Sequence, residues 1–134
     1  MLVDTVGLLL AVLVTAGHVQ DREGAIRLLA VLRHKCSRVR HIWADQAYAG
    51  DPWAWLWAVR PWRTVHLEIV KRPEGTKGFL LLPNRWIVER TCGWFNRYRR
   101  LSKDYELLTQ TSEAMIRVVM IHLMVRRLAR AVYF

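Results

Sequence analysis

Residues 85–101 read RWIVERTCGWFNRYRRL and have the pattern of one long amphipathic helix. Asn84 stands where an N-cap is needed, and no proline interrupts the run that follows it. We therefore expect about five helical turns between Arg85 and Leu101. Steps of ~100° give this helix an apolar arc that would face a core: Ile87, Thr91, Trp94, Phe95, Tyr98 and Leu101. The opposite arc is polar: Arg85, Glu89, Gly93, Asn96, Arg97 and Arg100.

The position of Glu89 on the polar arc allows two interpretations. A single carboxylate one turn after Arg85 could belong to a solvated, salt-bridged helix face, which is the common case. It could also bind a metal ion beside phosphate-binding arginines. That second interpretation requires another carboxylate elsewhere in the chain.

Composition limits the classes of partner. The 134 residues are enough for one domain with a core of its own. A balance of 21 Lys and Arg against 11 Asp and Glu gives a net charge of +10, which favours nucleic acid first and an acidic membrane surface second. The hydrophobic fraction of 53% argues against disorder, and most of the seven tryptophans fall in apolar runs, which favours packing over base stacking.

Cysteine and targeting signals favour a cytoplasmic location. Cys36 and Cys92 have no CxxC partner and no histidine at ligand spacing, so neither a zinc site nor a disulfide is expected. The apolar run at residues 8–16 lacks a preceding Lys or Arg and is too short to span a bilayer. No histidines share ligand spacing, so all are expected to be surface or packing residues: His18, His34, His41, His66 and His122.

Strands and helices alternate along the chain, which predicts the α/β class with a mixed sheet. The expected strands are residues 2–3, paired across a turn with 8–14, and then 39–44 and 66–70. The expected helices, besides 85–101, are 20–33, 53–59 and about 112–131. The last helix is apolar nearly all round through Val125, and we expect it to pack against the sheet.

Asp45 supplies the second carboxylate. It ends the strand predicted at 39–44, and functional groups in open α/β sheets gather beyond the carboxyl ends of strands. The later strand at 66–70 runs into residues 71–78, a basic loop punctuated by Gly and Pro. Asp45 and Glu89 are therefore the acids that we expect to pair.

Several motifs together resemble the C-terminal part of bacterial insertion-sequence transposases of the DDE type, in the groups numbered four and five. The resemblance lies in WADQAYAG at 43–50, IVKRP at 69–73 with KGF at 77–79, and RWIVERT at 85–91 with RYRR at 97–100. Residues 3–10, 19–25 and 101–106 also resemble the family, so the resemblance extends over essentially residues 1–134, which we expect to form one partial catalytic domain.

The resemblance implies metal-dependent DNA strand cleavage and strand transfer during transposition of an insertion sequence. Asp45 would be the second acid of the triad and Glu89 the third, holding two Mg²⁺ or Mn²⁺ ions that clamp the attacking and leaving oxygens. Arg85 would hold a phosphate or orient Glu89. The expected partners are transposon ends and target DNA, with no small-molecule substrate. The residues expected to contact DNA are basic: Lys71, Arg72, Lys77, Arg97 and Arg100.

The sequence departs from the family pattern at three places. A tyrosine three positions before the arginine is replaced by Leu82, and a lysine seven positions after the glutamate by Asn96, with Arg97 a possible basic substitute. The first acid belongs on a strand upstream of Met1, while Asp4 matches a turn aspartate that is not catalytic. The expected fold is thus an RNase H-like mixed sheet flanked by helices and truncated at the N-terminus, with the first central strand missing.

Without that strand, we expect this chain alone to be inactive and either marginally stable or prone to aggregation. It could be the downstream frame of a frameshifted gene, with the upstream-frame product or other transposase subunits as partners, a decayed remnant, or a protein with a mis-called start. The competing hypothesis is a non-enzymatic, basic DNA-binding remnant or an inhibitor of the full transposase. A membrane-surface protein has less support, because the cations lie on helices that already have a core face.

Overall fold

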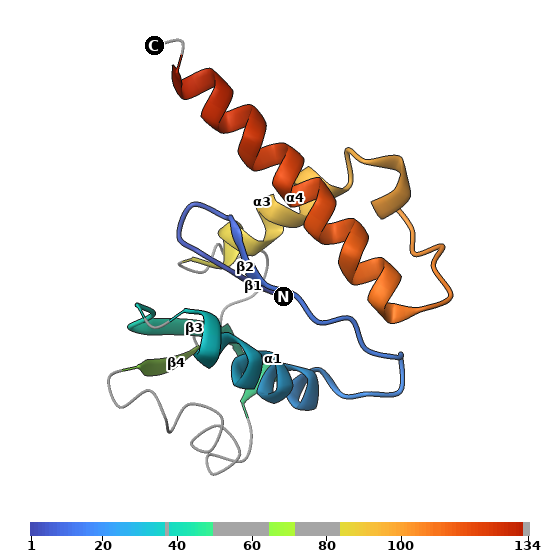
Figure 1. Ribbon diagram of the computed structural model, residues 1–134. Helices are drawn as coiled ribbons and strands as arrows, with labels where there is room; N and C mark the ends of the chain where they lie inside the picture. The colour runs from blue at the N-terminus through green and yellow to red at the C-terminus, as the bar shows by residue number, and fades with distance from the viewer. Residues whose placement is uncertain (37, 50–64, 72–83, 133–134) are drawn as a thin grey trace, which may run out of the picture.

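The computed structural model describes residues 1–36, 38–49, 65–71 and 84–132 (Figure 1). The helix predicted at 53–59 and all of the 71–78 loop beyond Lys71 lie outside these ranges. The described elements are three helices, two short 3₁₀ helices and four strands. The mixed α/β class expected from the sequence is therefore confirmed.

The strands form two separate sheets of two strands each. Strands β1 (Leu2–Val3) and β2 (Leu9–Ala11) are antiparallel, with an irregularity in register between Leu2 and Val3. Strands β3 (His41–Asp45) and β4 (His66–Val70) are parallel and pair in step from His41 with His66 to Asp45 with Val70. The strand expected at 8–14 is thus shorter than predicted, whereas the strand at 66–70 has the predicted bounds.

Helix α1 (Asp21–Lys35) covers the β3–β4 sheet (Figure 1). Its Leu29 packs against Ile42 of β3, and both side chains are at most 5% exposed. The partly buried residues around this pair include Leu2 of β1 and Leu67 of β4. The helical spacing of apolar residues in 20–33 therefore predicted the buried face of α1 correctly, since Leu28, Leu29 and Leu32 are all buried.

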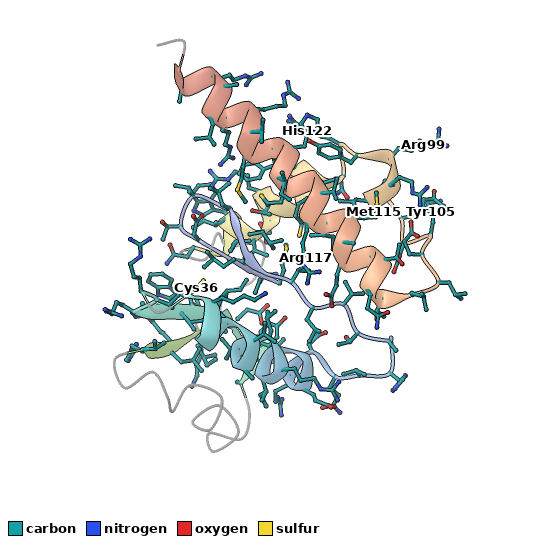
Figure 2. All side chains as sticks on the ribbon, in the orientation of Figure 1. Cys36, Arg99, Tyr105, Met115, Arg117 and His122 are labelled. Carbon is teal, nitrogen blue, oxygen red and sulfur yellow. The ribbon has the colours of Figure 1, made fainter. Side chains whose placement is uncertain are left out.

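Helix α3 (Arg85–Phe95) is shorter than the predicted 85–101 helix. The chain turns after Phe95, and Tyr98 adopts extended backbone angles before a 3₁₀ turn, η2 (Arg99–Leu101). This break lets both Tyr98 and Leu101 pack against the core beside Phe95, where Tyr98 also meets the ring of His122 edge-on (Figure 2). In a continuous helix, Leu101 would still lie on the apolar arc, but it would be farther from Phe95 along the helix axis.

Asn84 does precede the helix, although its side chain caps nothing. Its backbone is left-handed, with φ of 65°, and its carbonyl oxygen accepts from Ile87 N at 3.2 Å. The two arcs predicted for this helix are confirmed. Ile87, Thr91 and Phe95 are buried, and the polar residues from Arg85 to Arg100 named above are exposed.

Helix α4 (Thr109–Val132) begins three residues before the predicted start. Its Val119 and Met120 are buried with Phe95 of α3, and Leu8 and Leu9 of the hairpin region join this second core. Although the helix is apolar nearly all round through Val125, it is not covered on all sides by the described residues. One face of α4 remains more than half exposed: Val118, Ile121, Val125 and Leu128. No helix in the described ranges is both long and apolar enough to cross a membrane.

The turn between β1 and β2 joins the hairpin to α3. Asp4 Oδ1 accepts from Val6 N at 2.9 Å and from Leu8 N at 2.8 Å, which closes the turn. Gly7 has φ of +82°, and its carbonyl oxygen accepts from the Thr91 hydroxyl at 2.9 Å. A Cβ on Gly7 would lie 2.8 Å from Thr91 Oγ1 and 3.1 Å from the Trp94 ring. The turn therefore requires glycine for its conformation and for close approach to α3.

Gly7→Ala should lower the free energy of unfolding by about 2 kcal/mol or more, because left-handed backbone alone costs a residue with a Cβ roughly 1–2 kcal/mol. Urea denaturation followed by circular dichroism measures the change. Gly17→Ala is the matched control, since Gly17 has no atom within 4 Å of an added Cβ, and should change stability by less than about 0.5 kcal/mol. Equal effects of the two substitutions would show that the Gly7 contact does not hold the hairpin to α3.

Candidate functional site

Asp45 is the last residue of β3 and the N-cap of the short η1 helix (Gln46–Tyr48). Its Oδ1 atom accepts a hydrogen bond from Ala47 N at 3.0 Å, which fixes the carboxylate at the strand end. The side chain is partly accessible to solvent. The sequence-based placement of an acid at the carboxyl end of this strand is therefore correct.

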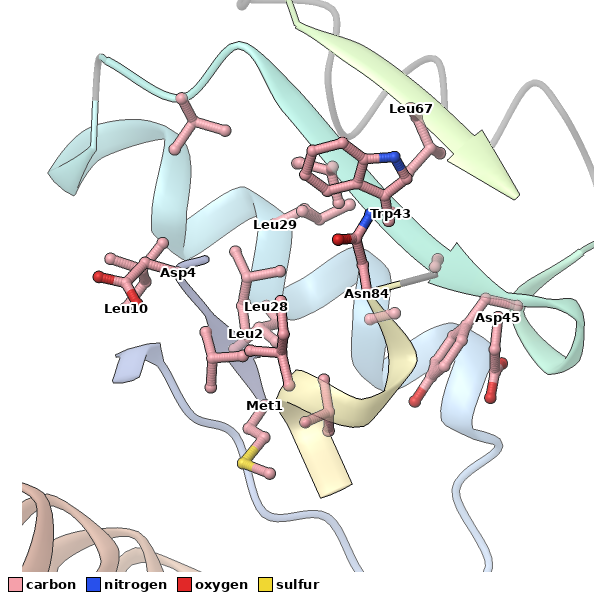
Figure 3. A pocket seen from close by; sticks show the side chains of 18 of the residues that line it. Met1, Leu2, Asp4, Leu10, Leu28, Leu29, Trp43, Asp45, Leu67 and Asn84 are labelled. Atoms are coloured by element: carbon pink, nitrogen blue, oxygen red, sulfur yellow. The ribbon is translucent and has the colours of Figure 1, made fainter. Parts of the chain in front are cut away.

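A cavity of about 670 Å³ lies between the two sheets (Figure 3). Strands β1 and β3 both contribute to its wall, and among the described residues each pairs with a neighbour on one side only. Much of the lining is apolar, including Leu2, Leu28, Leu29, Ile42 and Leu67. Asp45 lines this cavity from the carboxyl end of β3 (Figure 3).

Glu89 lines the same cavity from α3. Its Oε1 atom accepts from Arg85 Nε at 3.1 Å, and both side chains are more than half exposed. This arrangement is the one expected if Glu89 belongs to a solvated, salt-bridged helix face. An exposed pair at this spacing contributes only about 0.3–0.5 kcal/mol, so another cation could displace Arg85 from Glu89 at little cost.

The fold thus brings Asp45 of β3 to the same cavity as Arg85 and Glu89 of α3, although β3 and α3 are far apart in the sequence. Neither acid belongs to a close group of three metal-ligating side chains among the described residues. Such a group does occur at His41, His66 and Glu68, of which His41 also lines the cavity. From the sequence, these histidines were expected to be surface or packing residues, and the parallel pairing of β3 with β4 brings them together.

The pKa of Tyr48 reflects the negative charge in the cavity near Asp45. Burial raises the pKa of the Tyr48 phenol, and the negative charges of Asp21 and Asp45 raise it further. Asp21 was expected only to help begin a helix, and its presence in the cavity lining had no signal in the sequence. Added positive charge, such as a divalent cation, would be stabilised in this acidic environment.

The predicted DNA-contacting residues are exposed where the structure describes them. Lys71 follows β4, Arg97 follows α3, and Arg100 lies in η2. Arg100 forms an ion pair with Glu106, whereas no ion pair of Arg97 is found within the described residues. Arg72, Lys77 and Leu82 lie outside the described ranges.

Asp45→Asn should lower the pKa of Tyr48 toward its ordinary value, because one of the charges that disfavour the phenolate is removed. The pKa is measured by alkaline titration of ultraviolet absorbance, with the Tyr48→Phe protein used to isolate this phenol. It should stay above the ordinary value, since burial is the larger cause. Glu89→Gln is the control and should leave the titration unchanged; an equal shift would mean that Asp45 does not face Tyr48.

Comparison with known proteins identifies the family. The model of the transposase DDE domain matches residues 1–124, which is more than nine-tenths of the chain. Searches of curated proteins and of solved structures found no match. Family membership implies an RNase H-like fold, DNA binding, a role in transposition and the general use of divalent metal ions. The chain therefore belongs to the transposase DDE domain family.

Proposed function

We propose that this chain is the downstream part of the catalytic domain of an insertion-sequence transposase of groups four and five, which cleaves DNA strands and transfers them to a target. Asp45 and Glu89 supply two of its three acids. The observation that supports this most directly is the meeting of these two acids, from a strand end and from a distant helix, at one cavity of a DDE-family chain.

The residues present suit the divalent metal that the family implies. Mg²⁺ and Mn²⁺ take hard oxygen ligands, and Asp45 and Glu89 offer carboxylates that solvent can reach. Such ions, when bound, neutralise the charge that develops on the attacking and leaving oxygens of phosphoryl transfer. Arg85 then has the role of holding a phosphate or orienting Glu89, which its hydrogen bond to Glu89 supports.

The third acid, in this proposal, arrives on a central strand that fills the cavity between β1 and β3. Within the part of the chain that the structure describes, both strands pair on one side only, and the apolar wall between them suits an extended segment with alternating apolar side chains. Residues 1–134 by themselves then leave the metal site incomplete. The strand is supplied by upstream sequence in the same polypeptide or by an upstream-frame product.

A non-enzymatic role in DNA binding is the second candidate. The net charge of +10 and the exposed arginines after α3 support it without any catalysis. The Arg85–Glu89 pair also has an ordinary structural explanation. Strand cleavage and its dependence on the two acids distinguish these functions.

A protein extended through the upstream reading frame should cleave transposon-end DNA in the presence of Mg²⁺, and the 134-residue chain should not. Asp45→Asn or Glu89→Gln should each slow cleavage by more than about 100-fold, because even outer-shell partners of a metal site contribute 10–100-fold. Cleavage is measured by the release of labelled strand ends.

Glu23→Gln is the matched control, since Glu23 pairs with Arg27 at the same helical spacing and does not line the cavity. It should retain full activity. If Glu89→Gln behaved like Glu23→Gln, Glu89 would be only a salt-bridge partner. Cleavage by the 134-residue chain would instead contradict the need for a third acid on an added strand.

Binding of duplex DNA should weaken with salt, and Arg97→Ala should reduce the slope of log affinity against log salt by about 0.9, the value for one phosphate contact. Arg100→Ala should reduce it less, because Glu106 already neutralises part of that charge. Fluorescence anisotropy at several salt concentrations measures both slopes. Equal reductions would show that the Glu106 pair does not persist on DNA.

A further inference from the structure

The face of the β3–β4 sheet turned away from α1 carries an unusual group of polar side chains. Residues alternate between the two faces of a strand, so Ile42 and Leu67 point to the core while their neighbours point outward. The parallel register places His41 opposite His66 and Trp43 opposite Glu68. Two imidazoles and a carboxylate from segments more than 20 residues apart therefore meet on one surface.

The contacts within this group are close. His41 Nε2 lies 2.9 Å from Glu68 Oε2, and the ring centroids of His41 and His66 are 4.8 Å apart. One metal-ligating atom from each of His41, His66 and Glu68 lies within 4.8 Å of the other two. Trp43 Nε1 donates to the same Glu68 oxygen at 3.1 Å, and the Trp43 ring stacks on His41 at 4.2 Å.

We propose that His41, His66 and Glu68 form a binding site for a transition-metal ion of the Zn²⁺ class. Two imidazoles and one carboxylate are a ligand set that Zn²⁺ accepts, with water as the fourth ligand. Bonds of about 2.0–2.2 Å in a tetrahedron place the ligand atoms roughly 3.3–3.6 Å apart. Side-chain rotations would have to separate His41 Nε2 and Glu68 Oε2 slightly from 2.9 Å and bring His66 closer, and these side chains are exposed or partly exposed.

The surrounding contacts favour this use of the group. The Trp43 indole donates to Glu68 without itself belonging to the ligand set, and a hydrogen bond of this kind fixes the orientation of a metal ligand. The ion would link β3 to β4, which among the described residues form a two-stranded parallel pair, and a sheet this small gains stability from an added cross-link. This site differs in chemistry from the carboxylates at the cavity, which suit Mg²⁺, and it does not rest on the proposed function.

Titration of the full 134-residue chain with Co²⁺ tests the site, because tetrahedral Co²⁺ has visible absorption that Zn²⁺ then abolishes by displacement. One equivalent should bind without a thiolate charge-transfer band, since neither cysteine belongs to the site. His66→Ala and Glu68→Gln should each weaken binding at least tenfold. Zn²⁺ should also raise the thermal midpoint of the unsubstituted chain, and not that of His66→Ala.

His18→Ala and His122→Ala are the matched controls. His122 lies on α4, away from β3 (Figure 2), and His18 precedes α1. Both should bind Co²⁺ as the unsubstituted chain does, and all variants without metal should keep its circular dichroism spectrum. Unchanged affinity in His66→Ala, equal loss in His18→Ala, a thiolate band, or the same affinity in denaturant would each overturn the proposal.

Discussion

The hydrogen bond between Thr91 and Gly7 is the contact on which the arrangement of the candidate site depends. Thr91 is fully buried on α3, and its hydroxyl lies 2.9 Å from the Gly7 carbonyl oxygen and 3.0 Å from that of Ile87. Glu89 lies two residues earlier on the same helix. Because the space at Gly7 excludes any side chain, the turn of an N-terminal hairpin sets how closely α3 approaches the sheets. The carboxylate on α3 is thereby held at the cavity that Asp45 also lines.

The hairpin is central because both cores use it. Leu2 packs into the core formed by α1 and β3, whereas Leu8 and Leu9 pack into the core formed by α3 and α4. A strand pair with both faces in use cannot shift its register by one residue without exchanging the two sets of side chains. The cavity beside β1 interrupts the packing between these two cores, and its apolar lining is surface that the chain does not cover with its own described residues.

Negative and positive side chains lie in different regions around the candidate site. The aspartates near Tyr48 create negative charge beside a partly buried phenol, while the residues after α3 present exposed arginines. Phosphate groups of DNA are attracted to the second region, and divalent cations to the first. Trp94, partly buried, has Arg90 and Arg127 over its ring at 5.0 and 4.2 Å, so some of the positive charge also joins α3 to α4.

The sequence by itself determined the α/β class, the bounds of β4, the two arcs of the 85–101 region and the place of Asp45 at a strand end, because these depend on local periodicity and on turn chemistry. It predicted too long a helix after Arg85, since helical spacing cannot show where Tyr98 and Leu101 must turn to reach a core made with α4. Only the tertiary structure decided which distant side chains meet: Asp21 with Tyr48, and His41 with His66 and Glu68. Strand pairing and packing bring such residues together across long stretches of chain, and no spacing within one segment encodes that partnership.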